Sequence, residues 1–278
     1  AFNTAVGYGA GENITTGANN TLIGGTAGDA ITTGSNNSIY GSAAGGSITT
    51  APHNVAMGYA ALHSATDQGY NVAIGSTALY STVNGGKAVA VGYKALNAMN
   101  PSSDTDTYNV AMGYEAGKSV TTGIKNTLIG GLAGDALTTG TNNIAIGYLA
   151  LSSENEHGNN VAIGTGALLN QDAGQDAHNV AVGHNAGLTI TTGAFNTLIG
   201  GIAGDALTTG NTNTAVGYRA LSAETLGDAN VAIGTNALKS QNNTSDTDVY
   251  NVAIGHNAGT VITTAGDNVI IGGLAGDA

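Results

Sequence analysis

Residues 126–140 read NTLIGGLAGDALTTG, and nearly the same fifteen residues stand at 20–34 (NTLIGGTAGDAITTG) and 196–210 (NTLIGGIAGDALTTG), with a fourth copy beginning at Asn268. A catalytic constellation is normally written once, because a second copy adds nothing to the first. The repetition therefore indicates a structural unit, and its period has to be found before any site is considered.

The whole chain follows one short period. Sixteen copies of Asn-x-x-x-Gly begin at residues 3, 20, 37, 54, 71, 88, 109, 126, 143, 160, 179, 196, 213, 230, 251 and 268, with Ala in place of Asn at 88. The step is 17 residues, interrupted by two steps of 21 and one of 19. All sixteen copies keep Gly at the fifth position and Ala at the eighth. Each copy is therefore expected to be one coil of a repeating fold.

The period and the residue pattern favour strands. A helical-hairpin repeat needs about 30 residues or more, and a glycine in every unit would weaken a helix. The segment NVAIG alternates large, small and large side chains, as a strand with one face in a core does. We predict an all-β parallel β-solenoid of about 16 coils, a single array over residues 1–278. Each coil should hold two strands of about five residues, with second- and fourth-position side chains such as Ile163 inside.

The constant columns have structural explanations in such a stack. The fifth-position Gly supplies a positive φ or a close backbone approach at a corner, and the eighth-position Ala marks a place with room for one methyl group. Asn at the same point of every coil can pass an amide hydrogen bond to the Asn above and below. The predicted ladder includes Asn20, Asn71, Asn126, Asn160, Asn196, Asn230 and Asn251.

Composition limits the function classes. The chain has 45 Gly, no Trp, no Cys and 41% hydrophobic residues, mostly small aliphatic ones, which suits a thin core without disulfides. A formal charge of −12 argues against a nucleic-acid partner. No apolar stretch reaches the roughly 20 residues that span a bilayer. Because Ala1 and Phe2 match the coil end at Ala194 and Phe195, we expect a segment of a longer protein, cut mid-repeat at both ends.

With NVAIG at 71–75, 160–164, 230–234 and 251–255, each followed by a further Ala at the eighth position, the sequence resembles the head repeats of YadA-type trimeric autotransporter adhesins. It is still more similar to the NTAIGYxALxSNTTG repeats of phage tail-fibre proteins and related bacterial surface proteins. The resemblance implies a left-handed parallel β-roll, a rod of three chains, an extracellular location and a role in attachment, on a virion tail fibre or a bacterial cell surface. It also implies that the Val and Ile side chains fill each roll and that the third-position Ala column lies at the contact between chains.

Three insertions interrupt the period. The two 21-residue coils carry SDTDTY at 103–108 and SDTDVY at 245–250, and the 19-residue coil carries QDAGQDAH at 171–178. Asp104 with Asp106, and Asp246 with Asp248, are candidate Ca²⁺ ligands; the alternative is a solvated turn. The candidate loop residues presented to a receptor or glycan are Ser103, Asp104, Asp106, Tyr108, Gln171, Asp172, Asp176, Ser245, Asp246, Asp248 and Tyr250.

Other repeated residues fit structural roles. The aspartates of the GGxAGDA copies, Asp29, Asp135, Asp205 and Asp277, are expected in turns, because their spacing differs from the calcium-binding nonapeptide. His184 and His256 share the variable sixth column with several tyrosines, which indicates an exposed or rim position.

The expected function is that of a non-enzymatic segment of a trimeric attachment fibre, with no cofactor apart from the calcium candidate. The alternatives are a passive filament without receptor specificity, an ice-binding solenoid suggested by the paired threonines, and a glycan-processing solenoid.

Overall fold

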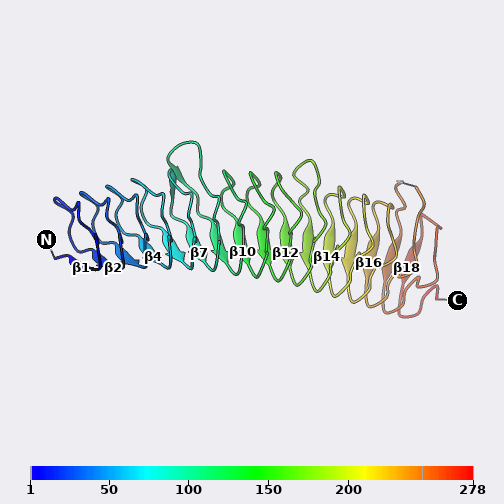
Figure 1. Cartoon of the computed structure of the whole chain (residues 1–278). Coiled ribbons are helices and arrows are strands. Elements are labelled where there is room, and N and C mark those ends of the chain that lie inside the picture. The colour runs from blue at the N-terminus through cyan, green and yellow to red at the C-terminus, as the bar shows by residue number, and fades with distance from the viewer. Residues whose placement is uncertain (1, 246, 278) are drawn as a thin grey trace. The chain divides into compact units, whose positions relative to one another are not determined.

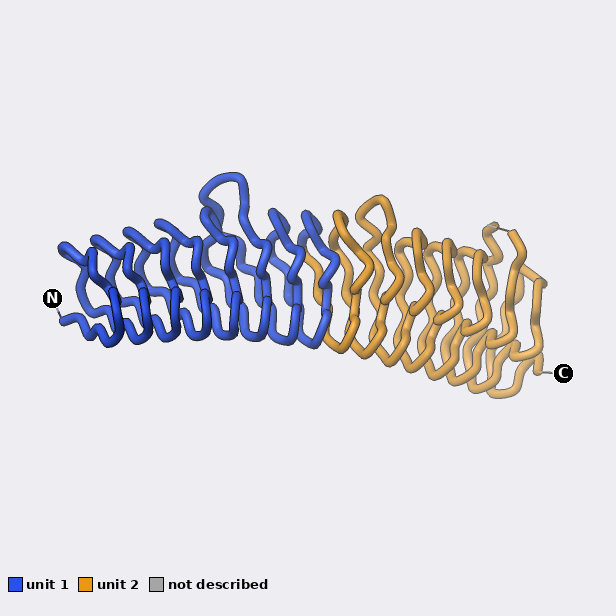
Figure 2. Tube along the Cα trace, viewed as in Figure 1, with its two compact units in different colours: residues 1–141 blue, residues 142–278 orange. Residues whose placement is uncertain are grey.

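The computed structural model describes residues 2–245 and 247–277. It is an all-β parallel β-solenoid of about 16 turns with a 17-residue repeat, and within each of its two units the coils stack in chain order (Figure 1). The chain divides into two compact units, residues 1–141 and 142–278 (Figure 2).

Each coil contributes one three-residue strand, which begins directly after the repeat's Asn. In the first unit these are β1 (Thr4–Val6), β2 (Thr21–Ile23), β3 (Ser38–Tyr40), β4 (Val55–Met57), β5 (Val72–Ile74), β7 (Val89–Val91), β9 (Val110–Met112) and β10 (Thr127–Ile129). In the second they are β11 (Ile144–Ile146), β12 (Val161–Ile163), β13 (Val180–Val182), β14 (Thr197–Ile199), β15 (Thr214–Val216), β16 (Val231–Ile233), β17 (Val252–Ile254) and β18 (Val269–Ile271).

The longer coils do not disturb the strand register. Val89 pairs with Val110 across a 21-residue step, and Val161 pairs with Val180 across the 19-residue step. Insertions therefore leave the sheet as additional loop, outside the strand.

The expectation of two strands per coil is wrong. Outside this sheet, the described residues hold the short parallel pair of β6 (Gly85–Gly86) and β8 (Thr105–Asp106) and one isolated parallel bridge between Asp228 and Asp248. The remainder of each coil is turn, because several positions adopt left-handed backbone, for example Tyr70 (φ 62°) and Leu79 (φ 49°). Residues in that conformation cannot continue an extended strand.

The assignment of the strand faces is also wrong. The third-position side chain points into the coil: Ala162 is fully buried, whereas Val161 and Ile163 on either side are only half-buried and face outward. Period-2 alternation separates two faces but does not say which one is inside. In this narrow coil the small side chains lie inside, and the larger Val and Ile side chains lie on the outer face.

The interior is filled by positions 3, 8 and 12, together with position 9. Position 9 is Leu where position 3 is Ala in both the same coil and the next one, as at Leu151, and it is Gly where position 3 of either coil is large, as at Gly134 beside Leu128. A Cβ on Gly134 would lie 2.8 Å from Leu128 Cδ2. The preceding coil also needs Gly at position 9, since a Cβ on Gly117 would lie 2.5 Å from Leu128 Cδ1. The recurring NTLIGG-x-AGDA stretch is thus the coil type with a large third residue and no side chain at position 9.

The buried Asn column links successive coils. The backbone N–H of Asn37 donates to Oδ1 of Asn20 (3.0 Å), and Asn37 Nδ2 donates to the same oxygen (3.1 Å) and to the carbonyl of Ala51 (3.0 Å). The backbone N–H of Asn196 likewise donates to Oδ1 of Asn179 (2.8 Å). These bonds satisfy a polar side chain inside a thin core, where an unpaired amide would be costly.

The fifth-position Gly has both of the roles expected for it. Gly183 has φ of +147°, and a Cβ there would lie 2.4 Å from the carbonyl oxygen of Gly200 in the next coil. Only glycine fits a corner where two backbones approach this closely.

Candidate functional site: the outer sheet face and the insert loops

The outer sheet face, defined here as the second- and fourth-position side chains of the strands, is apolar and open to solvent. It runs through every strand of each unit, because each coil adds a Val, Ile, Thr or similar residue at these positions. The most exposed fourth-position side chains away from the chain ends are Ile23, Met57, Met112, Ile199, Ile233 and Ile254. A continuous apolar face of this kind is typical of an association surface.

The third-position Ala column cannot make the chain-to-chain contact that the resemblance implied. Its members, such as Ala73 and Ala162, are fully buried inside their own coil. Any contact at this face has to be made by the Val and Ile side chains.

The sixth column borders the outer sheet face. Tyr59, Tyr148 and Tyr218 are exposed there, and so are His184 and His256, as predicted from the variable column. Tyr93 and Tyr114 stack with ring centroids 5.4 Å apart. The tyrosines therefore widen the apolar surface.

The three insertions emerge on the other part of the coil, between core position 12 and the next strand. Figure 1 shows the first two as arches that follow β7 and β12. Ser103, Asp104 and Asp172 are exposed, as expected of presented residues. The expectation that Gln171 is presented to a ligand is wrong, because its side chain is fully buried and its Nε2 donates to Glu154 Oε2 at 3.3 Å.

The turn that precedes an insertion is held differently from a regular turn. In a regular coil, three successive amides converge on one carbonyl of the next coil, as those of Thr32, Thr33 and Gly34 do on Thr49 (3.0–3.3 Å). In the turn before the third insertion, Oε1 of the buried Glu224 accepts the amide of Gly227 at 2.8 Å. The same oxygen accepts the amides of the two residues between them, at 3.0 and 3.2 Å.

The same substitution of a side-chain oxygen for a carbonyl occurs before the other insertions. Oε1 of Glu154 accepts the amides of Asn155 (3.1 Å) and His157 (3.2 Å). Oδ1 of Asn100 accepts the amide of Val83 (3.1 Å). Before the insertions at 171–178 and 245–250 the acceptor belongs to the turn itself, whereas before the insertion at 103–108 it is supplied by Asn100 of the coil that carries the insertion. Sequence reasoning missed Glu154 and Glu224, although a Glu in the mainly apolar twelfth column was a visible signal.

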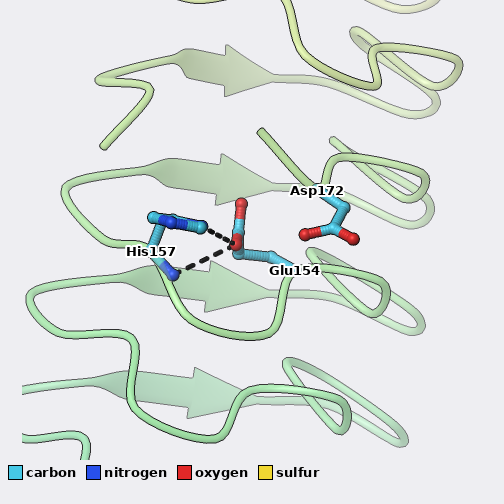
Figure 3. Close-up of side chains that lie close together, drawn as sticks. All are labelled: Glu154, His157 and Asp172. Carbon is cyan, nitrogen blue, oxygen red and sulfur yellow. Dashed lines mark hydrogen bonds and ion pairs between the residues drawn. The ribbon is translucent and has the colours of Figure 1, made fainter. Parts of the chain in front are cut away.

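One cluster resembles a metal site. Single ligand atoms of Glu154, His157 and Asp172 lie within 4.8 Å of one another (Figure 3). Glu154 is fully buried, and its Oε1 also lies 3.3 Å from His157 Nδ1. The corresponding glutamate, Glu224, is followed by Gly and Asn at the places of His157 and Asp172, yet it makes the same turn contacts. The arrangement is therefore explained by the turn, without a metal.

The aspartates of the two 21-residue coils have partners of their own. Asp106 forms an ion pair with Lys87 at 2.5 Å, and Asp248 accepts a hydrogen bond from the Tyr250 hydroxyl at 2.6 Å. Asp104 is exposed, and Asp246 lies outside the described residues. A calcium ion at the first loop would have to displace the ammonium group of Lys87, and calcium binding stays a prediction.

The insertion at 171–178 is tied to the coil beneath it. Asp176 accepts hydrogen bonds from the amide of Gly158 (2.8 Å) and from Nδ2 of Asn159 (2.9 Å). This loop is consequently less free to adapt to a ligand than its length suggests.

The turn aspartates differ in their surroundings. Asp29, Asp135 and Asp205 lie in turns. Burial raises the pKa of both Asp135 and Asp205. Asp135 has the ammonium group of Lys118 at 3.4 Å, whereas Asp205 Oδ1 is buried without a hydrogen-bond partner.

The threonine pairs use one hydroxyl each in the stack. Thr15, Thr121 and Thr208 donate from Oγ1 to the carbonyl of the equivalent residue in the next coil, at 3.0–3.1 Å. These hydroxyls already donate hydrogen bonds within the protein, which argues against a row of threonines that binds ice.

Within residues 2–245 and 247–277, no pocket is found and no helix is long and apolar enough to cross a membrane. None of the protein-family models, curated proteins or solved structures compared with this chain matches it. The chain is thus placed by its architecture alone, a parallel β-solenoid of 17-residue coils.

Proposed function

We propose that the chain is a structural segment of an extracellular attachment fibre, in which three copies pack through their outer sheet faces and project the insert loops outward. The observation that carries the proposal is the apolar outer sheet face, which continues from strand to strand in each unit. The number three and the attachment role come from the resemblance to adhesin-head and tail-fibre repeats.

The physical argument starts from the thin core. Each coil encloses a few small side chains, so that a single chain buries little apolar area per residue. Covering the Val and Ile side chains with the same face of other copies removes further apolar area from water. The acidic turns and the loops stay outside, where the net charge of −12 per chain opposes lateral aggregation.

The mass of the folded protein in solution tests the proposal. Native mass spectrometry or light scattering should give three times 27.1 kDa, or a multiple of that. Ile199→Asp combined with Ile233→Asp places two carboxylates on the outer sheet face and should shift the mass to that of one chain. The matched control is Thr192→Asp, which adds a carboxylate at an exposed turn position and should leave the mass unchanged. A folded wild-type monomer would refute the association.

The second candidate is a passive filament that associates in the same way but recognises nothing. Binding of the assembled segment to whole cells or a glycan array separates the two. Variants with each insertion cut back to the 17-residue length should lose that binding if the loops carry it, and wild-type protein that binds no surface favours the filament.

A further inference from the structure

The two 21-residue coils hold an aspartate and a tyrosine in the same relation. The Tyr108 hydroxyl donates to Asp106 Oδ2 at 3.4 Å, and the Tyr250 hydroxyl donates to Asp248 Oδ2 at 2.6 Å. The tyrosine side chains are 52% and 54% exposed. Each aspartate also pairs with the preceding coil in the same register, Asp106 with Gly86 and Asp248 with Asp228. The motif is therefore built twice on the same backbone frame.

In the first copy an ammonium group occupies the motif. Lys87 Nζ lies 5.6 Å from the centroid of the Tyr108 ring and forms an ion pair with Asp106. The hydrogen bond that Lys87 donates to the Asp106 carboxylate raises the pKa of Lys87, so that this ammonium stays charged. A cation over an aromatic face with a carboxylate beside it is a recognised ammonium-binding arrangement.

In the second copy the position of Lys87 is taken by Ala229. Elsewhere in this column a larger group covers the ring of the next coil: His53 stacks on Tyr70 at 5.0 Å and His178 on Phe195 at 5.6 Å. Ala229 offers only a methyl group to Tyr250.

The charges around the second copy also differ from those around the first. The next coil carries Asp267 where the first copy has Lys125. Among the described residues, no basic side chain forms an ion pair with Asp248 or Asp267. The second copy therefore has the aromatic face and the carboxylate without the cation.

We propose that Tyr250 and Asp248 bind a primary ammonium group from outside the chain, in the place that Lys87 fills at Tyr108 and Asp106. The shared chemistry is an ammonium on an aliphatic carbon, which a lysine side chain and an amino sugar both supply. This inference specifies the class of ligand that the presented loops would bind, and its functional meaning rests on the proposed function. The binding itself does not depend on association of chains, so its test is separate from the mass measurement.

The test is a titration followed by the ring resonances of ¹³C-labelled tyrosine in the full chain, assigned with Tyr250→Phe and Tyr108→Phe. The probe is n-butylammonium at low salt, because exposed charges are screened by salt. 1-Butanol controls for apolar contact, and sodium chloride controls for ionic strength. Glucosamine is the second probe, and the tighter of the two ligands indicates whether the source resembles an amino sugar or a lysine.

In the wild type, butylammonium should shift Tyr250 saturably and leave Tyr108 in place. Ala229→Lys supplies an internal ammonium and should weaken the Tyr250 titration at least about tenfold, as expected of a competitor tethered at high effective concentration. Lys87→Ala should open a second site and make Tyr108 titrate. Far-UV circular dichroism shows whether each variant is folded.

Several results would overturn the proposal. One is an Ala229→Lys protein that is folded and titrates like the wild type. Another is a Tyr250 shift produced equally by 1-butanol or sodium chloride, and a third is no saturable shift of Tyr250 with either amine. If Ala229→Lys does not fold, Lys87→Ala decides the question, and failure of Tyr108 to respond in that variant counts against the site.

Discussion

The complementarity of positions 3 and 9 makes a quantitative prediction at Leu128 and Gly117. These residues lie in neighbouring coils of the first unit, and a Cβ on Gly117 would lie 2.5 Å from Leu128 Cδ1. The other heavy atoms near that Cβ are 3.1 and 3.4 Å away, so Leu128 accounts for most of the clash. A double-mutant cycle can therefore isolate this contact.

The magnitudes follow from the structure. Leu128 is fully buried, so that Leu128→Ala should cost about 3 kcal/mol in free energy of unfolding. Gly117→Ala should cost about 2 kcal/mol from overpacking, and about 1 kcal/mol more because Gly117 has φ of +57°. Simple addition gives about 6 kcal/mol for the pair. In the double variant the new methyl group enters the space that Leu128 vacated, and only about 4 kcal/mol should be lost.

Denaturant unfolding with hydrogen exchange at β9 and β10 measures these values, since coils of a solenoid can open locally. The control pairs Leu128→Ala with Gly28→Ala, whose nearest neighbours are Ile31 and Leu22, and those two effects should add. If Leu128→Ala and Gly117→Ala add as fully as the control pair, the packing rule for positions 3 and 9 is wrong.

Three further substitutions test other parts of the structure. Ile163→Asp should leave residues 143–195 resistant to protease, because the side chain faces outward, and new cleavage there would contradict the assigned face. Glu224→Leu removes the acceptor of three turn amides and should lower the free energy of unfolding by about 2–4 kcal/mol. Glu224→Gln keeps an acceptor oxygen and should cost less. Equal amide exchange at Gly227 in both variants and in the wild type would refute the role of Glu224 as a turn acceptor. Asp205→Asn should stabilise the protein at neutral pH, because burial raises the pKa of Asp205 and its ionisation therefore opposes folding. That gain should vanish in acid, below the ordinary aspartate pKa of about 4, and a pH-independent gain would contradict the cause.

Much of the architecture is determined by the sequence alone. Identical coils have to repeat identical contacts, so that a 17-residue period with constant Gly, Ala and Asn columns specifies a stack of coils and its register. Steric limits made the role of Gly183 predictable, because only glycine allows the approach of Gly200 in the next coil. Position in the repeat likewise indicated that His184 and His256 are exposed.

The tertiary structure decided what the alternation could not. Val161 and Ile163 share a face whichever way the strand is turned, and only closure of the narrow coil placed Ala162 inside. That choice moved the candidate association surface from the Ala column to the Val and Ile side chains.

The tertiary structure also decided contacts between residues far apart in the chain. Lys87 and Tyr108 are separated by a 21-residue coil, and Glu224 became a turn acceptor because the coil above it leaves the stack. Such contacts depend on the path of a neighbouring loop, which no local pattern contains. The contrast between Ala229 beside Tyr250 and Lys87 beside Tyr108 became apparent only when the two coils were compared in space.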